Sequence, residues 1–381
     1  MKLLKLIIYV VLTLEVICAF PFSLNATLNL FLTLWIIFVL RCLLFRKVVS
    51  IYNSLIPFSL FFISFISYSK FSIYSYQQLS LIFVYISIFI LSQDLIPKKD
   101  IKKLIQFLGL VVLGYTLVEA LWILPYLKQV LNANIIKNMH HLKYIVSKQR
   151  TTAFFLTPNN LGIFLLFTLY AFWEYKNRIL RHLLSIVIIY CLITTKSIGV
   201  WICLSAVILL ILFKSKHKKY ALGGIILCIS ALTVVIWLRK DLIFNPHNLF
   251  FNPFYQRAKI WERSLMFISQ KPILGYGIGN FPILYNQGLP HHINQEIYAH
   301  NLLLQFWFEA GLMGYIWILL FYLFSLKVIF EKFTTDFFLT LCCITFLIHN
   351  LFDASFYLPK VGIFFWIFIA LLLRPANRHN I

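Results

Sequence analysis

Charged residues are scarce in this sequence. Only 12% of its 381 residues are Asp, Glu, Lys or Arg, whereas 61% are hydrophobic. A soluble domain carries about a quarter charged residues and rarely exceeds half apolar ones, so this composition excludes an ordinary soluble fold. Runs such as LNLFLTLWIIFVL and LLSIVIIYCLITT have no polar face to present to water. The sequence therefore predicts an all-α polytopic membrane protein.

Acidic residues are scarcer still, since 12 of them stand against 34 Lys and Arg and give a formal net charge of +22. In a soluble protein this excess would indicate a nucleic-acid partner. Membrane proteins collect Lys and Arg in their cytoplasmic loops for a different reason, namely orientation. We therefore expect no nucleic acid among the partners, and membrane lipids around the chain.

Recognisable cysteine motifs are also missing. The seven cysteines, at positions 18, 42, 191, 203, 228, 342 and 343, all lie in apolar segments and form no CxxC or Cys/His pattern. This excludes a zinc site and a disulfide framework, and we expect no bound metal and no cofactor. The N-terminal run MKLLKLIIYVVLTLEVICAF resembles a signal peptide, but Glu15 interrupts it and no A-x-A site follows. We interpret it as an uncleaved first span.

About twelve apolar segments are candidates for membrane spans. No period of 20–50 residues repeats along the chain, and neither an inverted repeat nor a soluble domain boundary is visible. Residues 1–381 are therefore predicted to form a single integral membrane domain. The segments lie near residues 6–22, 26–44, 53–69, 73–92, 104–124, 157–174, 180–195, 198–213, 220–237, 301–328, 336–356 and 361–373.

The loops between these segments alternate in charge. If the N-terminus is cytoplasmic, short inner segments hold 20 of the 34 basic residues. This asymmetry predicts that both termini are cytoplasmic. Residues 125–152 and 238–300 then form outer, periplasmic loops, the second long enough for short helices. Both loops are basic, although the positive-inside rule calls for basic residues only in cytoplasmic loops. Their charge fits either an anionic ligand or a solvated surface.

The second outer loop contains two patterns of interest. Arg257 and Trp261 are four residues apart at helical spacing, so they share one face. Spacing favours a packing pair, but a guanidinium can equally bind phosphate through two parallel hydrogen bonds. The glycines of GYGIGNF, residues 275–281, let the backbone turn sharply, and we interpret this run as a tight turn at the membrane surface.

Where this loop meets the tenth predicted span, the sequence reads EIYAHNLLLQFWFEAGLMGYIW, residues 296–317. His300 and Asn301 stand at the start of the span, and Glu309 lies more than two turns deeper. A neutral imidazole with a pKa near 6.5 can accept a proton from a hydroxyl, although a lone histidine at an interface is usually structural. Glu309 is expected either to orient a neighbour or to serve a buried polar contact, because a carboxylate at membrane depth is costly.

The first outer loop ends in RTTAFFLTPNNLGIFLLF, which starts at Arg150. Its Thr-Pro-Asn-Asn run can cap the N-terminus of the sixth span. This run, the segment RAKIWERSLMFISQKPILGYGIGNF, the motif beginning YAHN and the late HNLFDASFYLP together resemble the O-antigen ligase and O-antigen polymerase superfamily. The resemblance covers roughly residues 145–375 and implies a GT-C-like fold of about twelve spans.

The resemblance also implies an activity. Members of this superfamily transfer a glycan from an undecaprenyl-diphosphate carrier to an acceptor at the periplasmic face of the bacterial inner membrane, without a metal. By this resemblance Arg257 holds the diphosphate and His300 is the general base. The other residues expected to contact substrate are Arg150, Lys196, Trp261, Asn301 and Glu309.

Two positions depart from the motifs of the superfamily. Members of the superfamily often have a Ser-Arg-Gly run whose arginine is a second phosphate ligand, but in TTKSIGVW an isoleucine stands in its place. Lys196 or Arg150 could supply this second cation. The glycine that follows the arginine of the first motif is replaced by Ala153. The leading reading is an O-antigen ligase that transfers polysaccharide to a lipid A core. The alternatives are a polymerase that extends the glycan on its carrier, a protein O-oligosaccharyltransferase and, in a different class, a transporter.

Overall fold

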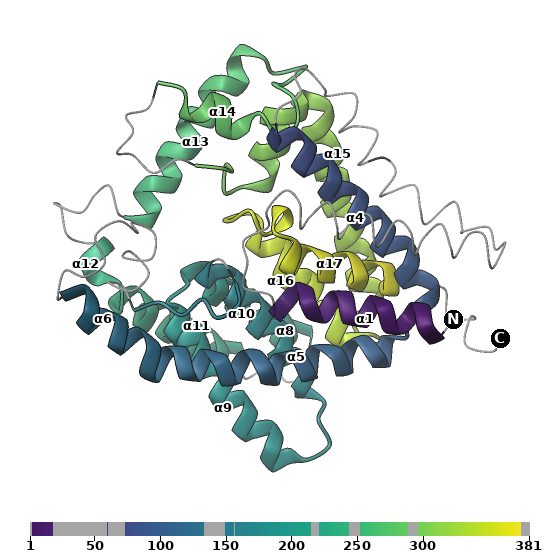
Figure 1. The fold of residues 1–381 in the computed structure, drawn as a ribbon, viewed down its shortest axis with the longest axis vertical. Coiled ribbons are helices and arrows are strands. Elements are labelled where there is room, and N and C mark those ends of the chain that lie inside the picture. Colours follow the sequence, from purple (N-terminus) through teal and green to yellow (C-terminus); the bar gives the residue numbers. More distant parts are fainter. Residues whose placement is uncertain are drawn as a thin grey trace. The chain divides into compact units, whose positions relative to one another are not determined.

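The computed structural model describes residues 2–17, 59, 73–132, 149–155, 157–214, 221–243, 252–288 and 296–374. Every regular element in these ranges is helical, which confirms the predicted all-α class (Figure 1). The elements are α1 (Lys2–Ile17), α4 (Ile73–Leu95), α5 (Lys98–Val118), η1 (Glu119–Ile123), α6 (Leu124–Asn132), α8 (Pro158–Trp173), α9 (Arg178–Thr195), α10 (Ile198–Lys214), α11 (Ala221–Trp237), α12 (Lys240–Ile243), α13 (Pro253–Gln270), α14 (Phe281–Asn286), α15 (Leu302–Lys332), α16 (Phe337–His349), η4 (Ser355–Tyr357) and α17 (Pro359–Leu372).

Four helices in this part of the chain are long and apolar enough to cross a membrane: Tyr74–Leu95, Lys98–Val130, Arg178–Thr195 and Leu302–Lys332. Shorter apolar helices, among them α10, α16 and α17, accompany them. The chain therefore has the character of a membrane protein. The predicted count of twelve spans is not established, because the segments 26–44 and 53–69 lie almost wholly outside the described residues. Most of the predicted loop 125–152 lies outside them as well, whereas 238–300 contains α12, α13 and α14.

The chain divides into two compact units. The first comprises Met1–Val11, Phe22–Pro97 and Asp241–Ile381, and the second comprises Leu12–Pro21 and Lys98–Lys240. Each unit is described by itself below. Arg257, His300 and the C-terminal HNLFD motif belong to the first unit, and Arg150 and Lys196 belong to the second.

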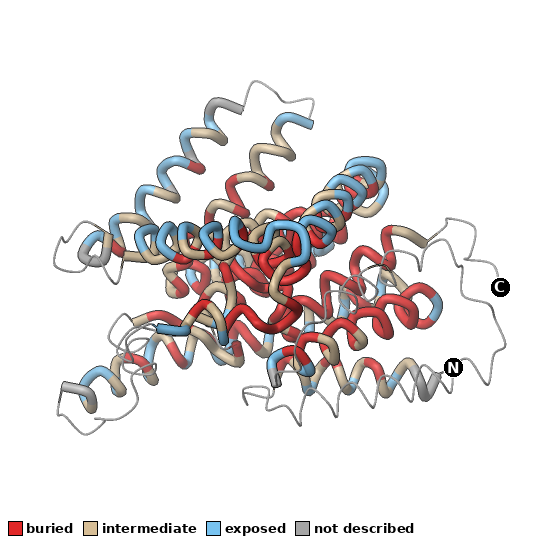
Figure 2. The backbone as a smooth tube through the Cα atoms, turned by 90° about the horizontal axis from the view of Figure 1, so that it is seen from above, coloured by how far each residue is buried: buried red, intermediate tan, exposed pale blue. Residues whose placement is uncertain are grey.

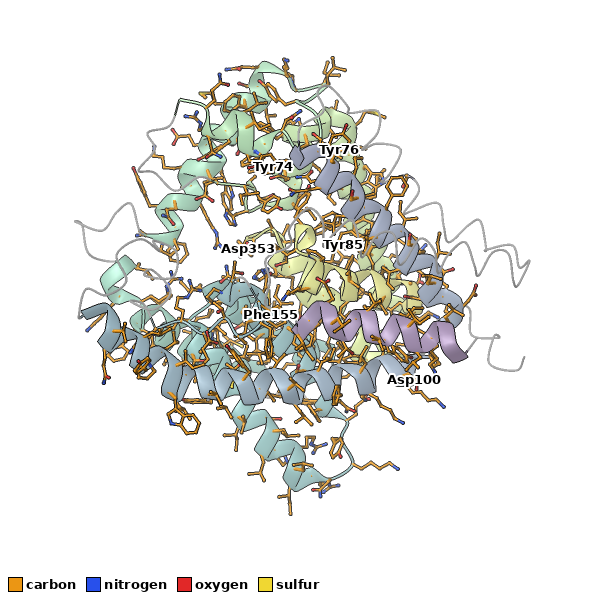
Figure 3. All side chains as sticks on the ribbon, in the orientation of Figure 1. Tyr74, Tyr76, Tyr85, Asp100, Phe155 and Asp353 are labelled. Carbon is orange, nitrogen blue, oxygen red and sulfur yellow. The ribbon has the colours of Figure 1, made fainter. Side chains whose placement is uncertain are left out.

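Aromatic side chains form the core of the first unit. Helix α17 packs against α4 and α16 and is buried along its whole length, like the parts of the backbone coloured red in Figure 2. Tyr85, labelled in Figure 3, donates its hydroxyl hydrogen bond to the carbonyl of Phe356 and stacks on Trp366, with 5.9 Å between the ring centroids. Phe346 stacks on Phe365 at 4.4 Å. These contacts fix the turn after α16, which carries part of the site described below.

The GYGIG run folds as the predicted tight turn and packs against α15. Gly275, Gly277 and Gly279 all have positive φ, and so does Gly311, which breaks α15 with φ 62° and ψ −156°. A Cβ on Gly275 would lie 2.4 Å from the backbone nitrogen of Gly311. The close approach lets the turn donate two backbone hydrogen bonds into the break, from Tyr276 to Phe308 and from Gly277 to Glu309. Only residues without a side chain permit this packing.

In the second unit α8 packs against α5 and α9, and α10 packs against α11. The predicted cap of the sixth span is present, since Thr157 accepts a hydrogen bond from the backbone N–H of Asn160 at the start of α8. The turn before it is held by Glu119, which lies in the π-helical turn η1. The carboxylate of Glu119 accepts hydrogen bonds from the backbone N–H groups of Thr152 and Ala153, at 3.0 and 2.6 Å.

This turn explains why the related motif has a glycine where this chain has Ala153. Ala153 adopts a φ of 46°, in the left-handed region that costs a residue with a Cβ roughly 1–2 kcal/mol. Glycine at this position would avoid that cost, but part of the gain in stability would be lost because glycine makes the unfolded chain more flexible. We expect Ala153→Gly to stabilise the protein by up to about 1 kcal/mol, seen as a higher midpoint of thermal unfolding in detergent.

A matched control is Ala171→Gly, since Ala171 is fully buried within the regular helix α8. There glycine should lower the midpoint, because it costs about 1 kcal/mol in a helix interior. A decrease of similar size for Ala153→Gly would show that the left-handed turn contributes no strain.

Candidate functional site

The polar site of the first unit is built where the start of α15 meets the turn after α16. Two Asn residues join these segments, Asn301 through its side chain and Asn350 through its backbone. Asn301 caps α15 by accepting a hydrogen bond from the N–H of Leu304 at 3.0 Å, and donates its own amide to the carbonyl of Leu351 at 3.2 Å. The carbonyl of Asn350 accepts a hydrogen bond from the N–H of Leu302 at 2.9 Å. The AHN and HNLFD motifs, which lie about fifty residues apart, therefore form one rigid junction.

His300 lies at the centre of this junction with a φ of 50°, a left-handed conformation that is uncommon for a residue other than glycine. The preceding residue, Ala299, is fixed through both its N–H and its carbonyl group. The N–H of Ala299 donates to the side chain of Gln305 at 2.7 Å, and the carbonyl of Ala299 accepts from the indole N–H of Trp261 at 3.0 Å. A strained conformation held in this way is typical of functional sites.

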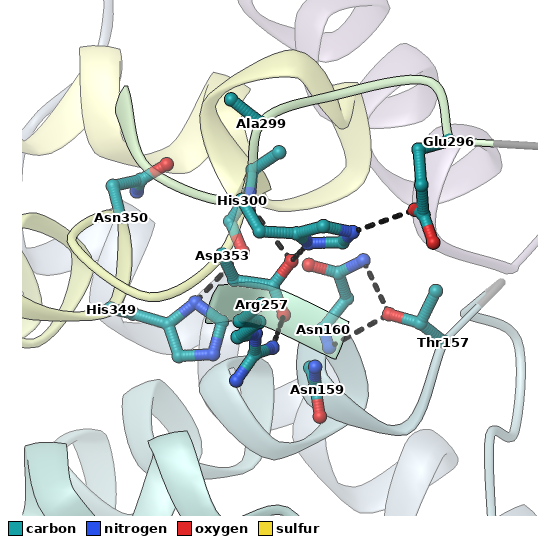
Figure 4. Close-up of polar contacts among 12 residues, drawn as sticks. Thr157, Asn159, Asn160, Arg257, Glu296, Ala299, His300, His349, Asn350 and Asp353 are labelled. Carbon is teal, nitrogen blue, oxygen red and sulfur yellow. Dashed lines mark hydrogen bonds and ion pairs between the residues drawn. The ribbon is translucent and has the colours of Figure 1, made fainter. Parts of the chain in front are cut away.

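Asp353 is the residue that joins the histidine to the predicted arginine (Figure 4). Its Oδ1 lies 3.0 Å from Nδ1 of His300, and its Oδ2 lies 3.5 Å from Nη2 of Arg257. Oδ1 also accepts a hydrogen bond from the N–H of Ala354, which fixes the carboxylate in the turn. Arg257 comes from α13, whose N-terminus is capped by Asn252. One carboxylate thus orients both the imidazole and the guanidinium.

A second carboxylate contacts the other ring nitrogen of His300. Oε2 of Glu296 lies 3.3 Å from Nε2. The backbone of Glu296 is fixed by Asn286 of α14, whose side chain accepts from the N–H of Glu296 at 3.0 Å and donates to its carbonyl at 2.8 Å. His349 completes the surroundings, with Nδ1 3.0 Å from Oγ of Ser355.

These contacts set the protonation of the site. Burial opposes the charged form of His300, but the hydrogen bonds and negative charges of Asp353 and Glu296 outweigh it and raise the pKa of His300 to about 9. Burial also opposes the ionised form of Asp353, but His300 and Arg257 hold the pKa of this carboxyl well below its usual range. The ordinary pKa of an imidazole, near 6.5, therefore does not apply to His300, because the two carboxylates favour its charged form.

The structure gives three other predicted site residues structural partners. Trp261 donates to Ala299 and packs in an apolar cluster with Ile260, Phe281 and Phe308, rather than against Arg257. Asn301 is the cap described above. These two residues fix the backbone on either side of His300, and their contact with substrate stays a prediction.

Glu309 lies in a network of its own, 2% exposed. Its carboxylate accepts hydrogen bonds from the N–H of Gly279 at 3.1 Å, from the amide of Gln305 at 2.8 Å and from the hydroxyl of Tyr357 at 3.4 Å. Of the two roles expected for it, a buried polar contact is the one observed. Through Gln305 the network also reaches Ala299, beside His300.

The two cations predicted in the second unit lie close together there. Nε of Arg150 donates to the carbonyl of Thr195 at 2.9 Å, and Lys196 ends α9 in a left-handed conformation with φ 50°. Nη2 of Arg150 lies 3.3 Å from the side-chain oxygen of Asn159, which also accepts from the hydroxyl of Ser197 at 2.7 Å. The guanidinium of Arg150 is therefore held beside the end of α9.

Sequence reasoning missed Asp353 and Glu296 as site residues. Asp353 stands in the HNLFDASFYLP segment, and Glu296 stands four residues before His300. The chain has only 12 acidic residues, so an acidic side chain within or next to a motif was the signal that could have identified Asp353 and Glu296.

Two comparisons with known proteins bear on this site. A family model described as O-Antigen ligase matches residues 183–319, which include Arg257 and His300. The ComP-specific O-oligosaccharyltransferase of Acinetobacter baylyi is 26% identical over 228 residues, which is 54% of this chain and 41% of that protein. The chain thus corresponds to about two-fifths of the length of this relative. Together they confirm the predicted resemblance to the O-antigen ligase superfamily.

Proposed function

We propose that this protein transfers a glycan from a polyprenyl-diphosphate carrier to an acceptor hydroxyl, with His300 as general base and Arg257 at the diphosphate. The observation that carries the proposal is the bridge formed by Asp353, whose carboxylate contacts both the imidazole of His300 and the guanidinium of Arg257. The relation to O-antigen ligases supports a glycosyltransferase reaction of this kind. The undecaprenyl carrier, the periplasmic site and the inner membrane are parts of the proposal.

In the proposed step, the oxygen of the acceptor hydroxyl forms a bond to the anomeric carbon of the glycan. The bond between that carbon and the carrier diphosphate breaks, and its electron pair remains on the diphosphate. Nε2 of His300 takes the hydroxyl proton, while Asp353 accepts the hydrogen bond from Nδ1 and stabilises the resulting imidazolium. Arg257 stabilises the negative charge that develops on the leaving diphosphate.

Arg257→Lys tests the role of the guanidinium. Lysine retains the charge but cannot form two parallel hydrogen bonds with phosphate oxygens. We expect transfer per folded molecule to fall by about 10- to 100-fold, a part of the 10²–10³ lost when one stabilising donor is removed. The measurement is turnover of carrier-linked glycan by the purified variant.

The matched control is Arg263→Lys on the same helix. Arg263 donates to the carbonyl of Gln287 and lies over the ring of Tyr285, away from Asp353. Its replacement should leave turnover within about twofold, since lysine retains the charge and the contacts of Arg263 are with Gln287, Phe267 and Tyr285. Near-normal turnover of Arg257→Lys would show that Arg257 does no more than pair with Asp353.

Glu296→Gln tests what sets the protonation of His300. The amide has nearly the shape of the carboxylate but no charge, so the pKa of His300 should fall. Because the base must be neutral, the rise of transfer with pH should move to lower pH, and turnover at pH 7 should increase relative to the alkaline plateau. Glu262→Gln removes the same charge from an exposed site on α13 and serves as the control. An unchanged pH profile for Glu296→Gln would contradict the assignment.

The acceptor is the finer part of the proposal, and we favour a lipid A core. Deletion of the gene in its own host distinguishes the candidates. A ligase predicts loss of the lipopolysaccharide ladder while polymer accumulates on the carrier. Core bearing a single repeat unit would instead indicate a polymerase, and loss of glycan from a protein would indicate an oligosaccharyltransferase, the activity named for the Acinetobacter baylyi relative.

A further inference from the structure

Helix α15 is longer than a bilayer requires. Its 31 residues extend about 46 Å at 1.5 Å per residue, whereas the hydrocarbon core of a bilayer is about 30 Å thick. The helix is not uniform along this length, because Gly311 has non-helical dihedral angles and divides it into two parts.

The two parts of α15 differ in exposure. From 302 to 310 no residue is exposed, and the first exposed residues are Leu312 and Met313, directly after the break. From there to Phe324, exposed apolar side chains recur at intervals of one to four residues and form one stripe: Leu312, Met313, Ile316, Leu320, Leu323 and Phe324. The exposed Lys327 takes the next position on this face, and Phe330 follows it. A continuous apolar stripe of this length on a helix indicates contact with lipid.

The part of the helix after Gly311 is long enough to cross a bilayer. Residues 312–332 extend about 31 Å, close to the ~30 Å of the hydrocarbon core, and the charged Lys327, Glu331 and Lys332 lie in its last two turns, where long side chains can extend toward the headgroups. The part of α15 before Gly311 is then not needed to cross the hydrocarbon core. Other segments of the first unit cover it, α13 among them.

The loop between α13 and α14 contacts α15 at the same level. Its tip carries Ile273 and Leu274, which are 66% and 80% exposed although both are apolar. The carbonyl of Ile273 accepts a hydrogen bond from the N–H of Leu312 at 3.1 Å, and the N–H of Gly275 donates to the carbonyl of Lys271 at 3.1 Å. Backbone groups paired in this way remove the main obstacle to placing a loop against lipid.

Residues typical of a membrane boundary surround this tip. The indole N–H of Trp307 donates to the carbonyl of Pro272 at 3.2 Å, and its ring packs against that of Tyr315 with 4.6 Å between centroids. The ammonium of Lys271 lies 5.0 Å from the ring centroid of Tyr276. Trp and Tyr are enriched at the membrane–water interface, and Lys extends from there toward water.

We infer that the hydrocarbon boundary on the His300 side of the membrane lies at Gly311, and that Ile273 and Leu274 insert among the lipid acyl chains beside α15. The occupant of this apolar surface is therefore lipid, since the stripe below the tip is continuous with it. The start of α15 then projects about 14 Å beyond the boundary. His300 lies on the aqueous side of the headgroup region, where a carrier diphosphate and a hydrophilic acceptor can both reach it.

Site-directed fluorescence quenching in lipid nanodiscs tests the inference. An environment-sensitive fluorophore is attached at Leu274→Cys and, as a second lipid-level position, at Met313→Cys. Ile297→Cys is the matched control, because Ile297 is also an exposed apolar residue but lies near His300. Wild-type protein taken through the same labelling gives the background from the native cysteines.

The labels at 274 and 313 are expected to be quenched by nitroxide placed high on the lipid acyl chain, and to be protected from iodide in the water. The label at 297 should show the reverse. Iodide quenching at 274 without lipid quenching would overturn the inference, since the tip would then lie in water. Protection at 274 from both quenchers would overturn it too, because protein would cover the tip.

Discussion

His300→Ala is expected to lower glycan transfer per folded molecule by about 10²–10⁴, the usual contribution of a positioned proton acceptor. The variant should still insert in the membrane and bind the carrier-linked donor, because Asn301, Gln305 and Trp261 fix the backbone around position 300 independently of the imidazole. The measurement is turnover of the purified variant on carrier-linked glycan, normalised to folded protein.

The same histidine predicts the pH dependence of the wild-type protein. With a pKa of about 9, His300 is protonated in most molecules at pH 7, and only the neutral form accepts a proton. Transfer should therefore rise about tenfold per pH unit from pH 7 and level off above about pH 9. The sign follows from the base role, since an imidazolium that acted by its charge would lose activity over this range instead.

His182→Ala is a matched control, because His182 lies exposed on α9. It should retain wild-type turnover and the same pH profile. Wild-type turnover per folded molecule in His300→Ala would leave the histidine as a structural residue at the start of α15.

Asp353→Asn is the second substitution with a large expected effect. Asparagine has the same shape but can no longer pair with Arg257 as an anion or fix the proton on Nδ1 of His300. Loss of a carboxylate that orients a catalytic histidine costs up to about 10⁴-fold, and we expect a decrease of 10²–10⁴-fold at the alkaline plateau. The remaining activity should rise at lower pH than in the wild type. His300 loses one of its two negatively charged neighbours, and its pKa therefore falls.

Asp336→Asn removes the same charge at the opposite end of α16 and should have little effect. The shift of the pH profile separates the proposed role from a structural one. A variant that merely folded poorly would lose activity equally at every pH, and such an outcome for Asp353→Asn would contradict the orienting role.

Local patterns in the sequence predicted much of the fold. The tenth apolar segment, 301–328, corresponds to α15, and the Thr-Pro-Asn-Asn run caps α8 as expected. Such features depend on residues within a few positions of one another, which periodicity and capping rules describe well. The break at Gly311 was not predicted, because it depends on the close approach of a turn 36 residues earlier in the chain.

The candidate site was predicted only in part for the same reason. His300 and Arg257 could be named from their motifs, but the contact between them passes through Asp353, which is 53 residues from His300. Nor could the pKa of His300 be inferred, since it depends on two carboxylates placed by separate turns. Glu309 was expected either to orient a neighbour or to serve a buried polar contact, and hydrogen bonds from Gly279, Gln305 and Tyr357 show how this buried carboxylate is accommodated.

The most direct test of the central claim is transfer by the purified wild-type protein in nanodiscs, supplied with polyprenyl-diphosphate-linked glycan and a hydroxyl acceptor. Released carrier diphosphate and acceptor-linked glycan are both measured between pH 6 and pH 10. We predict that the two products appear in equal amounts, that their rate rises with pH up to about 9, and that His300→Ala abolishes this rise. Equal transfer by His300→Ala and wild type across the whole range would contradict the assignment of His300, Asp353 and Arg257 as the site of reaction.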